Sequence, residues 1–168
     1  MVLVTYATKY GSTEEVARAV AEAIRETGVD VDIRLMRNVS TLQPYDGVVL
    51  GAALYMGRLH SDARHFLSEH GDALQSRPVA LFALGPVENT EKDWKGAREQ
   101  LKKELDKLPW FDPISTQVFG GTFNPAKLGF PLNLIPPLRK IPASDARDWD
   151  AIRSWAREQA ALLEPVAH

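Results

Sequence analysis

Two unbroken apolar runs, residues 48–53 and 79–84, constrain the fold of this chain more than any other feature. Strands that are covered on both faces, as in the middle of a parallel sheet, show such runs instead of an alternating pattern. Residues 29–35 instead alternate strictly between apolar and polar side chains. One face of that strand is therefore solvated, and the strand belongs at an edge of the sheet. A further short apolar run, residues 2–7, opens the chain.

The segments between these runs have the periodicity of amphipathic helices. In residues 12–27, Val16, Val20 and Ile24 recur at every fourth position, and Gly28 ends the helix. The later elements predicted in chain order are a helix over 61–74, a helix over 91–108, a strand over 114–120 and a helix over 144–163. This alternation predicts one α/β domain over residues 1–168, with helices on both faces of an open sheet. Because the second strand has an edge pattern and its neighbours are buried, the expected strand order is 2-1-3-4-5.

Residues 121–143 do not fit this regular scheme, because their prolines and glycines exclude one long helix. The segment carries the cations Lys127, Arg139 and Lys140 among many apolar side chains, namely Phe123, Leu128, Phe130, Leu132, Leu134, Ile135, Leu138 and Ile141. An insertion of this length is uncommon in a compact domain and is usually functional.

The composition excludes several classes of function. The 168 residues contain no cysteine, which excludes disulfides, thiolate metal sites, iron–sulfur clusters and a catalytic thiol. A net charge of −2 provides no basic field for binding nucleic acid. No apolar run is long enough to span a bilayer and no signal peptide opens the chain, so we expect a cytoplasmic protein.

The turn after the first run has the composition of a phosphate-binding loop, with the residues Thr8, Lys9, Tyr10, Gly11, Ser12 and Thr13 leading directly into a helix. The first N–H groups of a helix are unpaired and its dipole adds partial positive charge there, so hydroxyls and a glycine at this point suit a phosphate. An alternative is a capping box, in which Ser12 and Glu15 only satisfy the helix terminus. The nucleotide motifs G-x-x-x-x-G-K-[ST] and G-x-G-x-x-G are both missing from the sequence.

Two further loops are expected beside the first, because ligands of open parallel sheets bind outside the carboxyl ends of the strands. The loop after the third strand combines small residues with side chains that stack on a flat ring, and its candidate binding residues are Ala53, Leu54, Tyr55, Met56 and Gly57. The loop after the fourth strand contributes Leu84, Gly85, Pro86 and Val87. An alternative is that Tyr55 and Met56 only close the end of the core.

The first turn resembles the flavodoxin signature, an apolar strand followed by a hydroxyl-rich loop and a helix that together bind the phosphate of FMN. The positions that match it are Tyr6, Thr8, Gly11, Thr13, Ala17 and Val20, whereas Thr5 and Tyr10 depart from it. The resemblance extends over essentially the whole chain. It implies a flavodoxin-like three-layer fold, FMN as the cofactor, and contact between the second loop and the isoalloxazine ring.

Three segments are similar to the menaquinone-dependent protoporphyrinogen IX dehydrogenase branch of that family: residues 55–58, 118–121 and 147–152. This branch implies an FMN enzyme that oxidises a porphyrinogen and passes electrons to a quinone at the membrane. Residues 123–141 would then contact anionic lipid at the inner face of the membrane. Two alternatives stay open: an electron carrier whose insertion docks a partner protein, and an interaction domain without flavin.

Other residues are weaker candidates. His60, His65 and His70 are spaced by five, so a helix spreads them over different faces, and we expect solvated side chains and no metal site. Lys9 and Arg58 are candidates for positive charge near a phosphate or a carboxylated substrate. Asp145, Asp148 and Asp150 suit the start of a helix, and we assign no catalytic residue.

Overall fold

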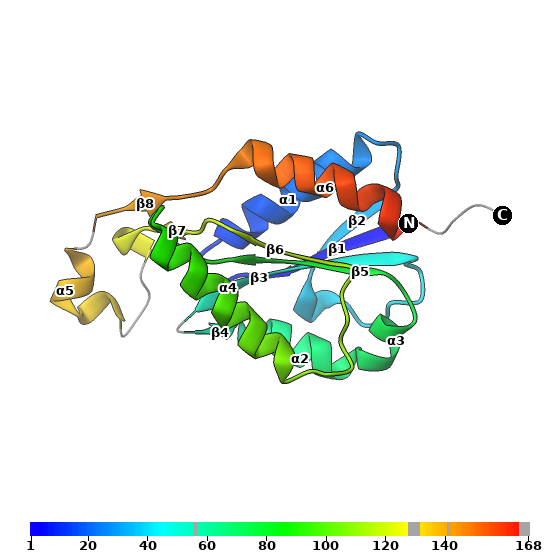
Figure 1. Ribbon diagram of the computed structural model, residues 1–168, viewed down its shortest axis with the longest axis horizontal. Coiled ribbons are helices and arrows are strands. Elements are labelled where there is room, and N and C mark those ends of the chain that lie inside the picture. The colour runs from blue at the N-terminus through cyan, green and yellow to red at the C-terminus, as the bar shows by residue number, and fades with distance from the viewer. Residues whose placement is uncertain (56, 128–131, 141, 165–168) are drawn as a thin grey trace.

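A computed structural model describes residues 1–55, 57–127, 132–140 and 142–164 (Figure 1). Five parallel strands form the main sheet: β1 (Val2–Ala7), β2 (Val31–Leu35), β3 (Gly47–Tyr55), β5 (Val79–Leu84) and β6 (Ser115–Phe119). Their order is β2-β1-β3-β5-β6, and β4 (Arg58–Leu59) pairs antiparallel with the end of β3. The strand order predicted from the sequence is therefore confirmed, with β2 at one edge.

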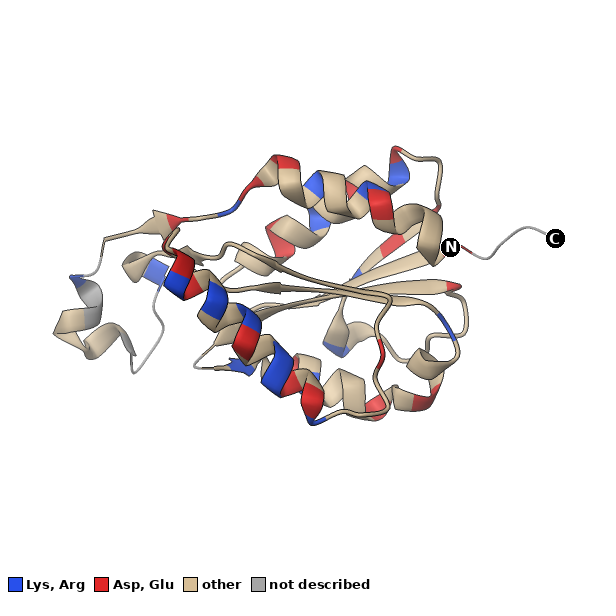
Figure 2. Ribbon diagram, in the orientation of Figure 1, with Lys and Arg blue, Asp and Glu red and all other residues tan. Residues whose placement is uncertain are grey.

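Helices cover both faces of the sheet and complete three layers (Figure 1). The helices are α1 (Ser12–Arg25) and α6 (Trp149–Leu163) on one face, and α2 (Ser61–Glu69), α3 (Gly71–Gln75) and α4 (Glu91–Asp106) on the other. Every residue of β1 and β5 is buried, as the unbroken apolar runs predict. Lys and Arg residues are interspersed with Asp and Glu residues along α4 (Figure 2).

Two predicted helices differ from those observed. The helix expected over 61–74 is interrupted at His70, which has φ −106° and ψ 18°. Gly71 follows, and glycine has a low helix propensity, so α2 and α3 form separately. The helix expected from residue 144 begins at Trp149 instead, because Asp148 caps it by accepting a hydrogen bond from Ala151 N at 3.0 Å. Ser144 and Asp145, which were expected to begin the helix, form a short strand.

The described part of the inserted segment, together with the strand that follows it, forms short elements that project from the sheet (Figure 1). These are β7 (Thr122–Phe123), η2 (Pro125–Lys127), η3 (Leu132–Leu134), α5 (Pro136–Arg139) and β8 (Ser144–Asp145). β7 and β8 pair antiparallel and form its base. Leu134 and Ile135 are 63% and 41% exposed. The predicted apolar residues Leu128, Phe130 and Ile141 lie outside the described residues.

Candidate functional site

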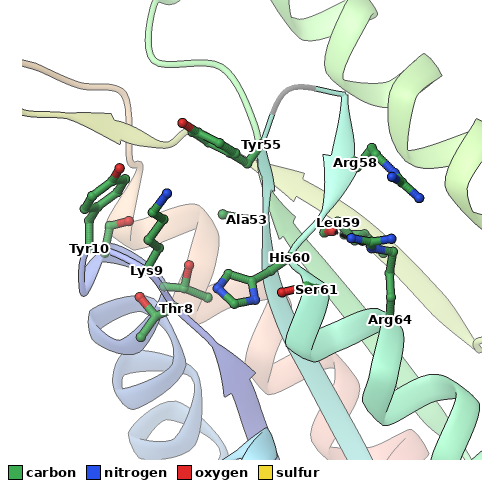
Figure 3. Close-up of a pocket in the computed structure, with 12 residues that line it drawn as sticks. Thr8, Lys9, Tyr10, Ala53, Tyr55, Arg58, Leu59, His60, Ser61 and Arg64 are labelled. Atoms are coloured by element: carbon green, nitrogen blue, oxygen red, sulfur yellow. Dashed lines mark hydrogen bonds between the residues drawn. The ribbon is translucent and has the colours of Figure 1, made fainter. Parts of the chain in front are cut away.

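A cavity of about 340 Å³ opens where the carboxyl ends of β1 and β3 meet (Figure 3). Its wall comes from the turn after β1, the end of β3, β4 and the start of α2, with the lining residues Thr8, Lys9, Tyr10, Ser12, Thr13, Ala53, Tyr55, Arg58, Leu59, His60, Ser61 and Arg64. Strands β2 and β3 lie on opposite sides of β1 in the sheet, so the strand order reverses its direction at β1. The cavity thus occupies the topological switch point, where open α/β sheets bind ligands.

Seven of the residues predicted to bind a cofactor line this cavity: Thr8, Lys9, Tyr10, Ser12, Thr13, Ala53 and Tyr55. Two others, Gly11 and Gly57, do not line the cavity but lie next to lining residues in the chain, and their φ values of +89° and +79° favour glycine. Leu54 pairs with Leu59 in the β3–β4 hairpin. Met56 lies outside the described residues.

The predicted residues after β5 are not among those that line the cavity. Leu84 is 2% exposed and belongs to the core. Gly85 N donates to Phe119 O at 2.9 Å, and Pro86 O accepts from Gly121 N at 2.7 Å. Val87 is half-buried. The main chain of this loop is thus engaged by the start of the insertion, and contact of these four residues with a cofactor stays a prediction.

Helix α1 begins without a side-chain cap among the described residues, unlike α2, α4 and α6. Its cap position is Gly11, whose N–H donates to Thr8 Oγ1 at 2.9 Å. Thr8 therefore uses its oxygen as an acceptor and keeps its own hydroxyl hydrogen for a ligand. The capping box considered from the sequence does not form, because Ser12 is already helical and the Glu15 carboxylate pairs with Arg147.

The charged side chains of the cavity are all basic. Lys9, Arg58 and Arg64 line it, and none of the described lining residues is Asp or Glu. Lys9 Nζ lies 4.9 Å from the centre of the Tyr55 ring and 5.4 Å from that of Tyr10, so it spans the space between two loops. Such cation–π contacts hold the ammonium over the aromatic faces. The cavity consequently favours an anionic ligand.

A buried carboxylate on α4 accepts a hydrogen bond from β4, which forms one wall of the cavity. Glu104 is 5% exposed, and it accepts hydrogen bonds from Leu59 N at 3.2 Å and Lys107 Nζ at 2.5 Å. Burial alone raises the pKa of Glu104, but these hydrogen bonds and the charges of Lys107 and Arg58 outweigh it, so the pKa lies below its ordinary value. Glu104 thereby fixes the strand that carries Arg58 and Leu59.

Arg147 connects the insertion to the first turn of α1. Its guanidinium pairs with Asp145 at 2.9 Å and with Glu15 at 2.5 Å, and lies 4.8 Å from the Trp149 ring centre. The hydrogen bond from Arg147 lowers the pKa of Asp145 and keeps it ionised. The base of the insertion is therefore tied to the helix that follows the turn after β1.

Sequence reasoning missed the part of the site contributed by α2. His60, Ser61 and Arg64 line the cavity, although the histidines were expected to be solvated. That expectation is wrong for His70, which is 8% exposed and lies against the Phe66 ring, and His60 is half-buried. The position of His60 could have been predicted from the sequence, because it directly precedes the expected helix that follows the third strand and its loop.

Comparison with known proteins establishes the family. A model of the flavodoxin domain family matches residues 3–132. The chain belongs to this family. Flavodoxin 1 from Bacillus cereus has a similar fold, with a TM-score of 0.62, 19% identity and coverage of 97% of this chain and 99% of that one. The family and fold imply a flavin cofactor, for which FMN is typical.

The similar curated proteins are named as oxidoreductases. Protoporphyrinogen IX dehydrogenase [quinone] of Escherichia coli K12 is 26% identical over 173 residues, covering 96% of both chains. An NAD(P)H dehydrogenase (quinone) of Methylocella silvestris is 30% identical over 92 residues, covering 42% of this chain and 46% of that protein. The predicted relationship to the protoporphyrinogen dehydrogenase branch is confirmed at the level of similarity, which supports an oxidoreductase with a quinone or redox partner. Among the described residues, no helix has the length and apolar character needed to cross a membrane.

Proposed function

We propose that this protein is an FMN-dependent oxidoreductase of the protoporphyrinogen IX dehydrogenase type, which oxidises a porphyrinogen and transfers the electrons to a quinone. The observation that carries the proposal is the match to the E. coli enzyme over 96% of both chains. The residues of this chain that fall outside the match are fewer than those of the insertion, so the similarity to this enzyme must include most of the inserted segment.

The phosphate of FMN would bind at the turn after β1. Thr8 has a free hydroxyl hydrogen, Ser12 and Thr13 add hydroxyls, and the uncapped first turn of α1 supplies main-chain N–H donors. Lys9 adds a positive charge. A cavity of about 340 Å³ without acidic side chains among its described lining residues fits this donor set and an anion.

The ring of FMN would lie beside the β3–β4 hairpin. Tyr55 is 42% exposed, with the Lys9 ammonium beside its ring, and would offer an aromatic surface for stacking, while Ala53 and Gly57 leave room for close approach. The loop with Leu84, Gly85, Pro86 and Val87 would border the opposite side. Bound FMN would supply the redox chemistry, which is two-electron exchange between the reduced substrate and the quinone. The protein's part is to bind, orient and shield it, and the hairpin anchored by Glu104 keeps this wall in place.

The insertion would bring the site to the membrane, where quinones reside. Leu134 and Ile135 are exposed apolar side chains, and Lys127 and Lys140 are exposed cations in the same segment. Apolar side chains with nearby basic ones suit the surface of an anionic bilayer. The proposal is a cytoplasmic protein bound peripherally to the inner face of the membrane.

The visible spectrum of the purified protein, followed by titration with FMN, tests the cofactor. Addition of protoporphyrinogen IX and a menaquinone analogue then tests the reaction, and we expect porphyrin fluorescence to increase with reduction of the quinone. A yellow protein that exchanges electrons only with a reductase would instead be an electron carrier. A colourless protein that does not bind FMN would be a flavin-free interaction domain.

Substitution of the exposed apolar side chains tests the membrane contact. The double variant Leu134→Glu/Ile135→Glu should bind less to vesicles that contain anionic lipid, and should keep its affinity for FMN. Leu162→Glu is a matched control, because Leu162 is 57% exposed on α6, outside the insertion. Equal vesicle binding by the double variant and the wild type would refute the membrane contact and leave the FMN proposal standing.

A further inference from the structure

His60 is positioned to present one ring nitrogen to the cavity. It is the cap residue of α2, and its Nδ1 accepts a hydrogen bond from Asp62 N at 3.0 Å. A nitrogen that accepts from a main-chain N–H carries no proton, so the neutral ring has its proton on Nε2. The helix cap thus selects one tautomer and leaves Nε2–H as a donor that the cap does not use.

The imidazole lies among groups that attract an anion. It is turned towards Thr8 of the turn after β1, on the same cavity wall as Ser61 (Figure 3). Lys9 and Arg64 line the cavity as well. The nearest acidic neighbour in sequence, Asp62, directs its carboxylate to Arg37, with 3.9 Å between Oδ2 and Nε, and lines a different groove with Met36 and Phe66.

We infer that His60 is a further binding residue of this site, which donates its Nε2–H to an oxyanion of the bound ligand. The inference rests on the proposed function. The oxyanion is either the phosphate of FMN or a carboxylate of the porphyrinogen, since both place acceptor oxygens with negative charge in a basic cavity. Capping alone would require only Nδ1 and explains neither the half-burial of the ring nor its direction into the cavity.

The variant His60→Asn separates the two roles of this side chain. Asparagine is a favoured cap residue whose Oδ1 accepts from the same main-chain N–H, but its side chain is too short to replace Nε2. His60→Ala removes both the cap and the donor. His65→Asn is the matched control on the same helix, because the His65 side chain is 79% exposed and pairs with Glu69.

The experiment measures the affinity of each full-length protein for FMN and for riboflavin, which lacks the phosphate, together with the melting temperature and the KM for protoporphyrinogen. If the oxyanion is the phosphate, His60→Asn weakens FMN binding about tenfold, and the riboflavin affinity and melting temperature stay unchanged. His60→Ala shows the same loss and melts at a lower temperature. His65→Asn behaves as the wild type.

If the oxyanion is a substrate carboxylate, His60→Asn keeps its FMN affinity and raises the KM for protoporphyrinogen with little change in kcat. Wild-type values for FMN affinity and KM in His60→Asn would overturn the inference and leave the proposed function intact. Failure of the wild type itself to bind FMN would overturn the proposed function and this inference with it.

Discussion

The loops after β1 and β5 follow two buried strands that flank β3, at the same edge of the sheet, but their polar groups are used differently. In the β1 loop (residues 8–11), the hydrogen bond from Gly11 N to Thr8 Oγ1 closes the turn, and Thr8, Lys9 and Tyr10 face a cavity. In the β5 loop (residues 85–90), the main chain of Gly85 and Pro86 bonds to β6 and the insertion. Further along it, Thr90 caps α4 by accepting from Asp93 N.

The difference shows that two loops at the same edge of an open sheet leave different polar groups available to a ligand. The β1 loop leaves donors and positive charge unused by the fold, whereas the β5 loop uses its groups to hold the insertion. One loop is consequently suited to binding an anion, and the other to positioning a segment that a regular five-stranded scheme does not contain.

The largest loss of stability is expected for Gly120→Ala, which disturbs the connection between β6 and the insertion, where the β5 loop is hydrogen-bonded. A Cβ at Gly120 would lie 1.9 Å from the carbonyl oxygen of Ala146, so the backbone of one segment must shift. We expect a loss of about 3 kcal/mol in the free energy of unfolding, measured by chemical denaturation. The control Gly96→Ala in α4 meets nothing within 4 Å and should be neutral or stabilising. Equal stability of both variants would show that the connection tolerates displacement.

Thr8→Val tests the β1 loop as the anion site. Valine has nearly the same shape but neither accepts from Gly11 N nor donates to a ligand. We expect about 2 kcal/mol weaker FMN binding, roughly thirtyfold in affinity, with riboflavin binding little changed. Equal losses for FMN and riboflavin in a titration would instead indicate collapse of the loop, and the contrast between the two loops would lose its basis.

The sequence predicts the regular part of the fold well, because burial in a parallel sheet leaves a local pattern. The run from Val2 to Ala7 coincides with β1, and the alternating segment is the edge strand β2. The β1 loop was predicted on similar grounds, since hydroxyls and a glycine before a helix are adjacent in sequence. Seven candidate residues, from this loop, the start of α1 and the end of β3, line the cavity.

Contacts between distant segments could not be predicted in this way. The two-residue ladder of β7 and β8 joins residues about twenty positions apart and has no periodicity of its own. In the sequence, Glu104 has the pattern of an ordinary charged residue of an amphipathic helix. Its burial and its hydrogen bond from Leu59 N depend on where the β3–β4 hairpin folds back. The engagement of Gly85 and Pro86 likewise depends on the path of the insertion.

Glu104→Gln tests the wall opposite the β1 loop. Because the folded-state pKa of Glu104 lies below its ordinary value of 4.5, ionised Glu104 contributes stability above that pH, and the contribution is lost as the pH falls through the folded-state pKa. We expect the variant to be about 1–2 kcal/mol less stable at pH 7, since glutamine keeps an acceptor for Leu59 N but loses the ion pair with Lys107.

The difference between the two proteins should become smaller as the pH falls below about 4.5, because only the wild type loses this contribution. Unfolding curves across this pH range measure it. A difference that stays constant with pH would mean that the charge of Glu104 does not support the wall.

The smallest effect is expected for Gly11→Ala. No atom lies within 4 Å of a Cβ at this position, so the penalty comes only from its φ of +89°. We expect about 1 kcal/mol less stability, together with weaker FMN binding because the turn must relax. Calorimetric melting with and without FMN separates the two effects. An unchanged affinity for FMN would show that the β1 loop does not need this conformation to bind the phosphate.

The phosphorus NMR spectrum of FMN mixed with an equimolar amount of protein tests most directly whether the β1 loop binds a flavin phosphate. We expect a phosphate resonance displaced from that of free FMN in the wild type, and a return towards the free position in Thr8→Val. A resonance at the position of free FMN in the presence of folded wild-type protein would contradict this expectation.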